Sequence, residues 1–338
     1  MYSTLISAQQ LQALHKSGQP CMIFDCSFEL MQPAAGAQQY RQAHIPGALR
    51  ADLEQHLSAR KTVRPELVEG LTEASTRSDR TDAASGGRHP LPSRETFSAW
   101  LSSVGFANTM QAVVYDRQGA NYCGRLWWML KWAGHEAVAV LDGGLQAWQA
   151  NGGETHSGTG NTSNEITGAP ASTSNYALTP AKTALIATET ITKQLGRPTQ
   201  TLIDARGTPR FKGEVEPLDP VAGHIPGALN RPSNLNLDSE GKFKPAATLR
   251  AEFEALLAGR DPASVVHHCG SGVSAVPNLI AMEVAGLGRT GFYAGSWSEW
   301  CSDPARPAAQ GYSSSTLPAR KWLISLETGS KAQTTKQV

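Results

Sequence analysis

The sequence predicts an α/β fold in which two similar halves each form a parallel sheet with helices on both faces. Three observations lead to this prediction. The hexapeptide His44-Ile-Pro-Gly-Ala-Leu49 recurs unchanged as His224-Ile-Pro-Gly-Ala-Leu229, and such an identity within one chain indicates an internal repeat. Short apolar runs alternate with amphipathic runs in each half, which is typical of a parallel sheet. The landmarks around the hexapeptide also keep nearly the same spacing in both halves.

The expected strands occupy matching places in the two halves. They cover 22–25 and 112–116 in the first half, and 201–204 and 264–267 in the second. In the second half, helices are expected over 248–257 and 275–284, with Gly286 ending the latter. Because reactive groups gather at the carboxyl ends of strands in open α/β sheets, a site is expected where the strand of 264–267 ends.

One interval breaks the agreement between the halves. His44 and Asp116 are 72 positions apart, whereas His224 and Cys269 are 45 apart. The extra residues of the first half fall at about residues 60–87, a polar stretch that we interpret as a surface insertion. The predicted organisation is an inactive first domain, a linker, a catalytic second domain and a tail, over 1–152, 153–175, 176–315 and 316–338.

The composition narrows the function classes. Hydrophobic residues make up 40% of the 338 positions and the net charge is +1, so neither nucleic acid nor an anionic membrane is expected as a partner. The five cysteines form no CxxC pair, so no disulfide framework and no metal are expected, and nothing calls for a cofactor. Neither a signal peptide nor a run of 18 apolar residues is seen, so a cytoplasmic protein is predicted.

Cys269 is the strongest candidate for chemistry. It follows an apolar run, and a loop of small residues separates it from a predicted helix that starts at Ala275. Free backbone N–H groups and the positive end of the helix dipole meet at such a place, and they favour the reactive thiolate. The glycines at positions 270 and 272 allow the loop to turn its N–H groups inward as an anion cradle.

Two other cysteine-based functions fit the loop poorly. Cysteine-dependent phosphatases need an arginine six positions after the cysteine, and Ala275 stands there. A metal site at His267, His268 and Cys269 is disfavoured because adjacent strand residues point to opposite faces. Cys301 is interpreted as a buried apolar thiol rather than a redox partner of Cys269.

The two halves differ at the reactive position, because the first has Asp116 where the second has Cys269. The repeated hexapeptide, this aspartate, the Cys-Gly-Ser-Gly-Val-Ser loop and the run Gly295-Ser-Trp-Ser-Glu-Trp300 together resemble the two-domain rhodanese-type sulfurtransferases. The resemblance covers roughly residues 5–150 and 176–310. It implies two rhodanese-like domains and transfer of sulfane sulfur through a persulfide on Cys269.

The loop sequence suggests the sulfur donor. Within the family, Cys-Gly-Ser-Gly-Val-Thr is typical of 3-mercaptopyruvate sulfurtransferases, whereas Arg-Lys after the cysteine is typical of thiosulfate-preferring rhodaneses. Gly270 and Ser271 stand at those positions, and Ser274 keeps the hydroxyl of the family threonine. The resemblance therefore favours 3-mercaptopyruvate, bound at the loop residues Gly270, Gly272, Val273 and Ser274.

Arg210 matches the substrate arginine of the family, and its guanidinium suits a carboxylate. Arg206 is interpreted as structural. Some relatives carry a second arginine shortly before the second hexapeptide, but the segment around Leu218 has none. This departure leaves open a weakened or altered use of mercaptopyruvate.

The resemblance also implies a proton-transfer arrangement in which Ser271 is polarised by a histidine that matches His44, with an acidic partner near Glu29. A turn histidine that anchors the repeat is the other interpretation of His44, because His224 occupies the same motif. The acceptor is expected to be a thiol or cyanide. Thiosulfate:cyanide transfer, or a persulfide carrier that serves a protein partner, remains an alternative.

Overall fold

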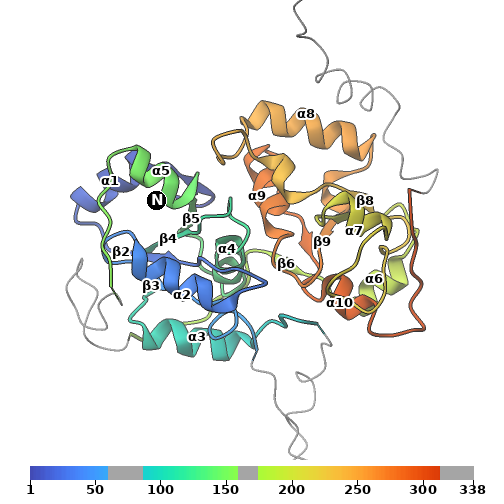
Figure 1. Cartoon of the computed structure of the whole chain (residues 1–338), viewed down its shortest axis with the longest axis horizontal. Helices are drawn as coiled ribbons and strands as arrows, with labels where there is room; N and C mark the ends of the chain where they lie inside the picture. The colour runs from blue at the N-terminus through green and yellow to red at the C-terminus, as the bar shows by residue number, and fades with distance from the viewer. Residues whose placement is uncertain (60–86, 159–173, 313–338) are drawn as a thin grey trace, which may run out of the picture.

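The computed structural model describes residues 1–59, 87–158 and 174–312. They form two lobes side by side, each built around a five-stranded parallel sheet (Figure 1). Nearly all of the predicted insertion, most of the predicted linker and the whole predicted tail lie outside the described residues.

The first sheet has the strand order β1-β5-β4-β2-β3. Its strands are β1 (Leu5–Ile6), β2 (Cys21–Asp25), β3 (Leu49–Arg50), β4 (Gln111–Tyr115) and β5 (Val138–Leu141). The helices of this half are α1 (Ala8–Lys16), α2 (Pro33–Gln42), α3 (Arg94–Ser103), α4 (Cys123–Trp132) and α5 (Gly144–Ala150).

The second sheet repeats this order as β6-β10-β9-β7-β8. Its strands are β6 (Ala184–Leu185), β7 (Thr201–Asp204), β8 (Leu229–Asn230), β9 (Val265–His268) and β10 (Gly291–Phe292). The helices are α6 (Thr188–Gln194), α7 (Thr208–Lys212), α8 (Ala246–Leu257), α9 (Val276–Val284) and α10 (Ser296–Trp300), with 3₁₀ turns over Ser233–Asn236 and Pro262–Ser264.

The predicted α/β fold with two parallel sheets is confirmed. Every strand pair in both sheets is parallel, and each expected strand and helix lies within two residues of its observed bounds. The expected end of α9 is also found, because Gly286 follows the helix with a φ of +68°.

Helices cover both faces of the first sheet, as a parallel sheet requires. Alternate strand residues belong to two separate apolar clusters: Phe24 and Val114 lie in one, Ile23 and Val113 in the other. The first cluster also takes residues from α3 and α4, and the second takes residues from α1 and α5. Because neighbouring strand residues point to opposite faces of the sheet, the apolar residues of each strand provide one packing surface for each of the two helix layers.

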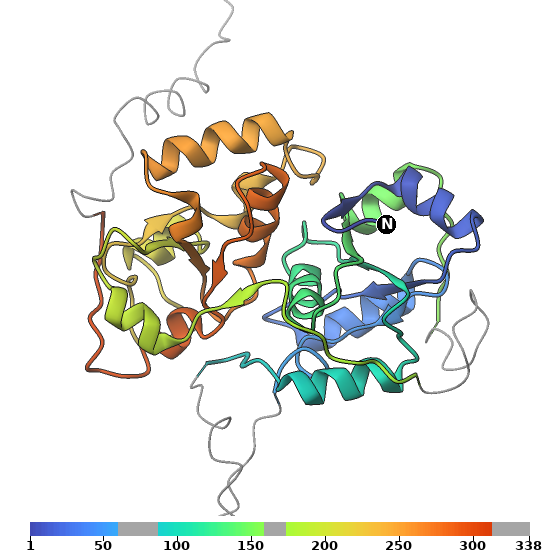
Figure 2. The ribbon, with the colours of Figure 1, turned by 180° about the vertical axis from the view of Figure 1, so that it is seen from behind.

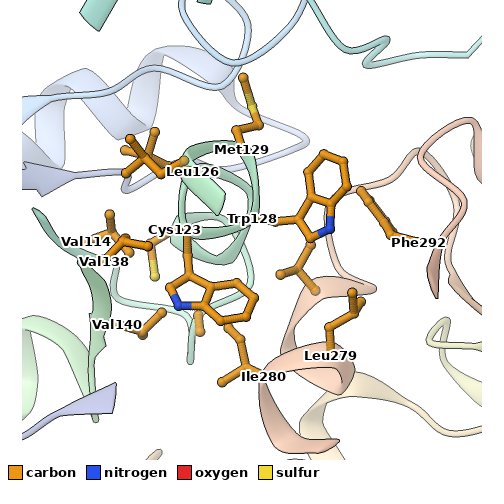
Figure 3. Packing of buried hydrophobic residues seen from close by; sticks show 14 of the residues in the cluster. Val114, Cys123, Leu126, Trp128, Met129, Val138, Val140, Leu279, Ile280 and Phe292 are labelled. Atoms are coloured by element: carbon orange, nitrogen blue, oxygen red, sulfur yellow. The ribbon is translucent and has the colours of Figure 1, made fainter. Parts of the chain in front are cut away.

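The two lobes share one apolar core at their junction. Helix α4 of the first half packs on α9 of the second, and its Trp128 lies near Leu279 of α9 and meets Phe292 of β10 edge to face (Figure 3). Gly124 allows this close approach, since a Cβ there would lie only 3.2 Å from the side chain of Val276. The core continues from one lobe to the other, so the lobes are fixed by packing as well as by the chain.

Polar links reinforce the junction. The buried Lys131 Nζ lies 3.2 Å from Glu283 Oε1 on α9, and Thr4 Oγ1 donates to the same oxygen at 2.6 Å. The chain crosses between the lobes just before β6 (Figure 2). On the way, Tyr176 stacks on Phe106 of the first half at a ring distance of 5.7 Å.

Candidate active site

Cys269 follows the last residue of β9, at the carboxyl edge of the second sheet, and is 1% exposed. Its loop is anchored to the start of α10. The Cys269 N–H donates to Ser296 Oγ at 3.1 Å, and the Cys269 carbonyl accepts from the Trp297 N–H at 2.9 Å. The Gly270 carbonyl accepts from the Ser298 N–H at 2.8 Å. These contacts turn the first carbonyls of the loop away from its centre.

The next turn of the loop depends on Gly272. Its φ is +72°, and a Cβ at this position would lie 2.0 Å from the Ala294 carbonyl oxygen. The Gly272 carbonyl accepts from Arg125 Nη1 at 2.6 Å, across the junction between the halves. The N–H groups of residues 270–275 donate to no acceptor in the described ranges. The loop therefore presents unused donors, as the predicted anion cradle requires.

The first half shows what such a cradle holds. Asp116 takes the place of Cys269, and its carboxylate accepts four backbone N–H groups at 2.8–3.1 Å, from Gln118, Ala120, Tyr122 and Cys123. Counted from the reactive position, these donors correspond to residues 271, 273, 275 and 276 of the second half. The loops differ in detail, because Ala120 has a φ of +66° and the matching Val273 has no positive φ, but both curl around the side chain at the reactive position.

A small cavity of about 60 Å³ lies between the halves at this loop. The second half contributes Arg210 and four loop residues, and the first half contributes six side chains, so neither half forms the site alone. The lining residues are Leu30, Leu53, Arg88, His89, Asn121, Tyr122, Arg210, Gly270, Ser271, Val273 and Ser274.

Arg210 lies in the cavity wall. Its Nη2 is 2.7 Å from Glu216 Oε1 and 3.2 Å from Asp219 Oδ2. Burial raises the pKa of Glu216, but hydrogen bonds from Arg210 and from the Leu218 N–H outweigh it and hold this pKa below its usual value. Burial raises the pKa of Asp219, against the opposing effect of nearby arginines. The guanidinium of Arg210 is thus held by carboxylates beside the loop.

Arg206 lies deeper than Arg210 and is bound by structural contacts. It is 3% exposed, donates to the buried Asp204 at 2.7 Å and to the Gly223 carbonyl at 2.6 Å, and packs on the ring of Trp297. Burial raises the pKa of Asp204, but Arg206 and His268 hold it below its usual value. This pair supports β7 beneath the reactive loop.

The structure places His89, rather than His44, next to Ser271. His89 Nδ1 lies 2.8 Å from Ser271 Oγ, and both side chains are buried. The expected pairing of Ser271 with His44 is therefore not the one observed. His44 stacks on Tyr40 and has its Nδ1 2.8 Å from the Tyr40 carbonyl oxygen.

His224 makes the same contacts in the second half, with Nδ1 2.8 Å from the Phe211 carbonyl oxygen and its ring stacked on Phe211. The repeated histidines His44 and His224 thus serve the turn of the repeat. Sequence reasoning missed His89, which follows the insertion and has no counterpart in the repeat; its only signal was a histidine beside Arg88 at the edge of that stretch.

The remaining side chains near the reactive strand are buried. His267 Nε2 lies 3.2 Å from Met282 Sδ, whereas His268 Nδ1 lies 3.9 Å from Asp204 Oδ2, so the two rings face opposite sides of β9 as expected. Burial lowers the pKa of His267 to about 3. Cys301 is 9% exposed, and its Sγ lies 3.9 Å from the Ser298 carbonyl oxygen.

Comparison with known proteins agrees with this geometry. Residues 7–151 and 187–303 match the Rhodanese-like domain family. The chain belongs to the rhodanese family. This rhodanese is 42% identical to the probable 3-mercaptopyruvate sulfurtransferase of Pseudomonas aeruginosa, over 91% of the chain and 98% of the relative. It is 37% identical to a putative thiosulfate sulfurtransferase of Mycobacterium tuberculosis, over 91% and 97%.

Among solved structures, the 3-mercaptopyruvate sulfurtransferase from Leishmania major superposes with a TM-score of 0.69 at 28% identity, covering 89% of this chain and 74% of that one. The predicted membership of the two-domain rhodaneses is thereby confirmed. In the described ranges of this rhodanese, none of the helices is both long and apolar enough to cross a membrane.

Proposed function

We propose that this rhodanese transfers sulfane sulfur from 3-mercaptopyruvate, through a persulfide on Cys269, to a thiol or cyanide acceptor. The observation that carries the proposal is the set of unused N–H donors around Cys269, of which those of residues 271, 273 and 275 match positions where the first half binds a carboxylate. Preorganised donors of this kind stabilise an anionic sulfur such as a persulfide.

In the first step, the Cys269 thiolate attacks the sulfur of the donor. An S–S bond forms and the C–S bond of the donor breaks. The electron pair of the broken bond passes to the carbon, which leaves as the enolate of pyruvate and takes up a proton. The thiol proton of the donor balances this uptake, so the step needs no further reactant.

In the second step, an acceptor thiolate or cyanide attacks the outer sulfur of the persulfide. The new bond forms to the acceptor, and the Cys269 thiolate leaves. The Ser271 hydroxyl and the His89 ring, 2.8 Å apart, are placed to move the proton of the first step. Arg210, which lines the cavity beside the loop, supplies a cation for the donor carboxylate.

Thiosulfate as the donor is the second candidate, and the name of the Mycobacterium tuberculosis relative favours it. Steady-state kinetics with both donors, each with cyanide and with a small thiol as acceptor, separate the two. A preference for 3-mercaptopyruvate supports the proposal, and a preference for thiosulfate overturns the donor assignment. Single turnover with every small acceptor instead favours a persulfide carrier that serves a protein partner.

Replacement of Cys269 by serine tests the nucleophile. C269S should fold normally, lose sulfur transfer and gain no sulfur atom by intact-protein mass spectrometry after exposure to the donor. C301S is the matched control, because it removes another buried thiol and should keep both activity and persulfide formation. Transfer retained in C269S contradicts the proposal. The cytoplasmic location expected from the sequence belongs to this proposal, and cell fractionation tests it.

A further inference from the structure

The carboxylate of Asp219 is a buried acid beside the cavity that the proposed mechanism does not use. Its side chain is 3% exposed, and its Oδ2 lies 3.4 Å from Arg88 Nη2 and 3.2 Å from Arg210 Nη2. Both arginines line the cavity. An acidic side chain of the protein itself therefore already occupies the cations of the cavity wall.

Glu216 is a second carboxylate at Arg210, and it is bound more completely than Asp219. Its Oε1 accepts from Arg210 Nη2 at 2.7 Å and from the N–H groups of Leu218 and Asp219 at 3.1 and 3.2 Å. Its Oε2 lies 3.3 Å from a nitrogen of Arg206 and from a nitrogen of Arg210. Because several hydrogen bonds stabilise the charged form of a carboxylate, Glu216 is a fixed anion.

The carboxylate of Asp219 has weaker support for its charge. Its contacts with the two arginines are long, and no backbone N–H of the described residues donates to it. Burial raises the pKa of Asp219 and the charge of Glu216 raises it as well, whereas nearby arginines oppose the rise. The charged or titratable groups around it are Arg88, Arg206, Arg210, Glu216 and the Cys301 thiol. Of the two carboxylates at Arg210, Asp219 is thus the one suited to take up a proton.

The charges around the two cavity arginines are already balanced. Arg88 and Arg210 carry two positive charges, and Glu216 and Asp219 set two negative charges against them. A carboxylate ligand would bring a third negative charge to the same two guanidiniums. Neighbouring carboxylates repel one another, so the one with the weakest support is expected to become neutral when the ligand enters.

We propose that Asp219 is a proton-exchanging counter-ion of this site, which takes one proton from solvent when a small carboxylate binds and returns it when the carboxylate leaves. Neutral Asp219 frees the guanidinium nitrogens that it holds, and the ligand then uses them. The affinity for carboxylates therefore depends on pH although the ligand stays ionised. The identity of the donor rests on the proposed function, whereas the proton exchange follows from the crowding of carboxylates at Arg88 and Arg210.

Pyruvate is the probe, because it is a monoanionic carboxylate and its binding needs no turnover. Isothermal titration calorimetry in buffers of different ionisation enthalpy gives both the dissociation constant and the number of protons taken up. The wild-type protein should take up close to one proton at about pH 8, and its Kd should rise by up to 10-fold per unit of pH from about pH 7 to about pH 9. D219N should take up no proton, and its Kd should be independent of pH.

E214Q is the matched control for the change in net charge. Glu214 is exposed and pairs with Lys212 rather than with the cavity arginines, so E214Q removes one negative charge at a distance from the site. It should keep the proton uptake and the pH dependence of the wild-type protein. D219N should fold, because asparagine keeps the shape of the side chain and Glu216 still holds Arg210.

A wild-type protein that binds pyruvate without proton uptake overturns the proposal, and so does one that does not bind pyruvate. Uptake that persists in D219N assigns the proton to another group and also overturns it, as does a loss of uptake in E214Q. Proton-coupled binding of pyruvate in a protein that does not turn over 3-mercaptopyruvate overturns the donor and leaves the role of Asp219 standing.

Discussion

Replacement of Arg125 by methionine tests how the first half holds the reactive loop. Arg125 lies on α4, is fully buried, and donates to three carbonyls. Its Nη1 reaches Gly272 at 2.6 Å, while its Nη2 reaches His89 at 2.9 Å and Leu57 at 3.3 Å. One side chain therefore positions both the loop after Cys269 and the chain that carries His89.

The expected loss of stability follows from two opposing effects. Three buried carbonyls lose their donor, at about 1–3 kcal/mol each. The opposing effect is the burial of the charge, which lowers the pKa of Arg125 from 12.5 to about 10, with Cys269 partly opposing the shift. This shift corresponds to a cost of roughly 3 kcal/mol for holding the charged guanidinium in the folded protein. Methionine removes that cost and fills similar volume. We expect R125M to lower the free energy of unfolding by about 2–4 kcal/mol.

The effect on activity should be larger than the effect on stability. Without its donor, the Gly272 carbonyl is free to turn, and a displacement of about 1 Å in a reacting group costs on the order of 100-fold in rate. We expect R125M to lower kcat by about that factor under conditions where urea titration shows the protein to be folded. Arg125 is thus a positioning residue, and its loss should also reduce the alkylation rate of Cys269.

R117M is the matched control. Arg117 donates to Asp25 at 3.2 Å and to the Gln39 carbonyl at 3.1 Å, within the first half. It should lose stability to a similar extent while kcat stays within about twofold, because the reactive loop is untouched. The reasoning is refuted if R125M keeps wild-type kcat while folded, or if R117M loses as much activity.

Three further outcomes are expected. Burial holds the pKa of His267 at about 3 in the folded protein, against 6.5 in the unfolded chain. Between these values the unfolded chain binds a proton that the folded protein does not, so the free energy of unfolding should fall by about 1.4 kcal/mol per pH unit as the pH drops below 6.5. H267Q should flatten this slope in urea titrations. G272A should lower the free energy of unfolding by more than about 2 kcal/mol and remove most of the activity, since its Cβ would meet a carbonyl oxygen. G288A, at a φ of +88° in open space, should lower the free energy of unfolding by only about 1–2 kcal/mol. D116N should lose about 2–4 kcal/mol of stability by urea titration, because four N–H groups bind that carboxylate, yet its kcat should match wild type.

The fold could be predicted from the sequence because its signals are local or repeated. The strand residues 201–204 and 265–268 show their apolar character within a few positions, and the duplicated hexapeptide aligns the two halves. The strand order in one half then repeats in the other. Cys269 was predictable for the same reason, since its strand, its loop and its helix are consecutive in the chain.

The rest of the site depends on how the halves dock, which no local pattern records. His89 and Ser271 are 182 positions apart, and Arg125 and Gly272 are 147 apart. His89 has no counterpart in the repeat, and the family resemblance pointed to His44 instead. Arg88 directly follows the predicted insertion, and a basic residue there carries no sequence signal until the fold brings it over Gly270.

The division of the cavity between two halves also sets when the protein becomes reactive. Arg88, His89 and Arg125 precede Cys269 in the chain, so the ribosome makes them before the nucleophile. The loop acquires these three partners only when the later half has folded and docked on the earlier one. The complete surroundings of the thiol therefore exist only in the docked pair of halves.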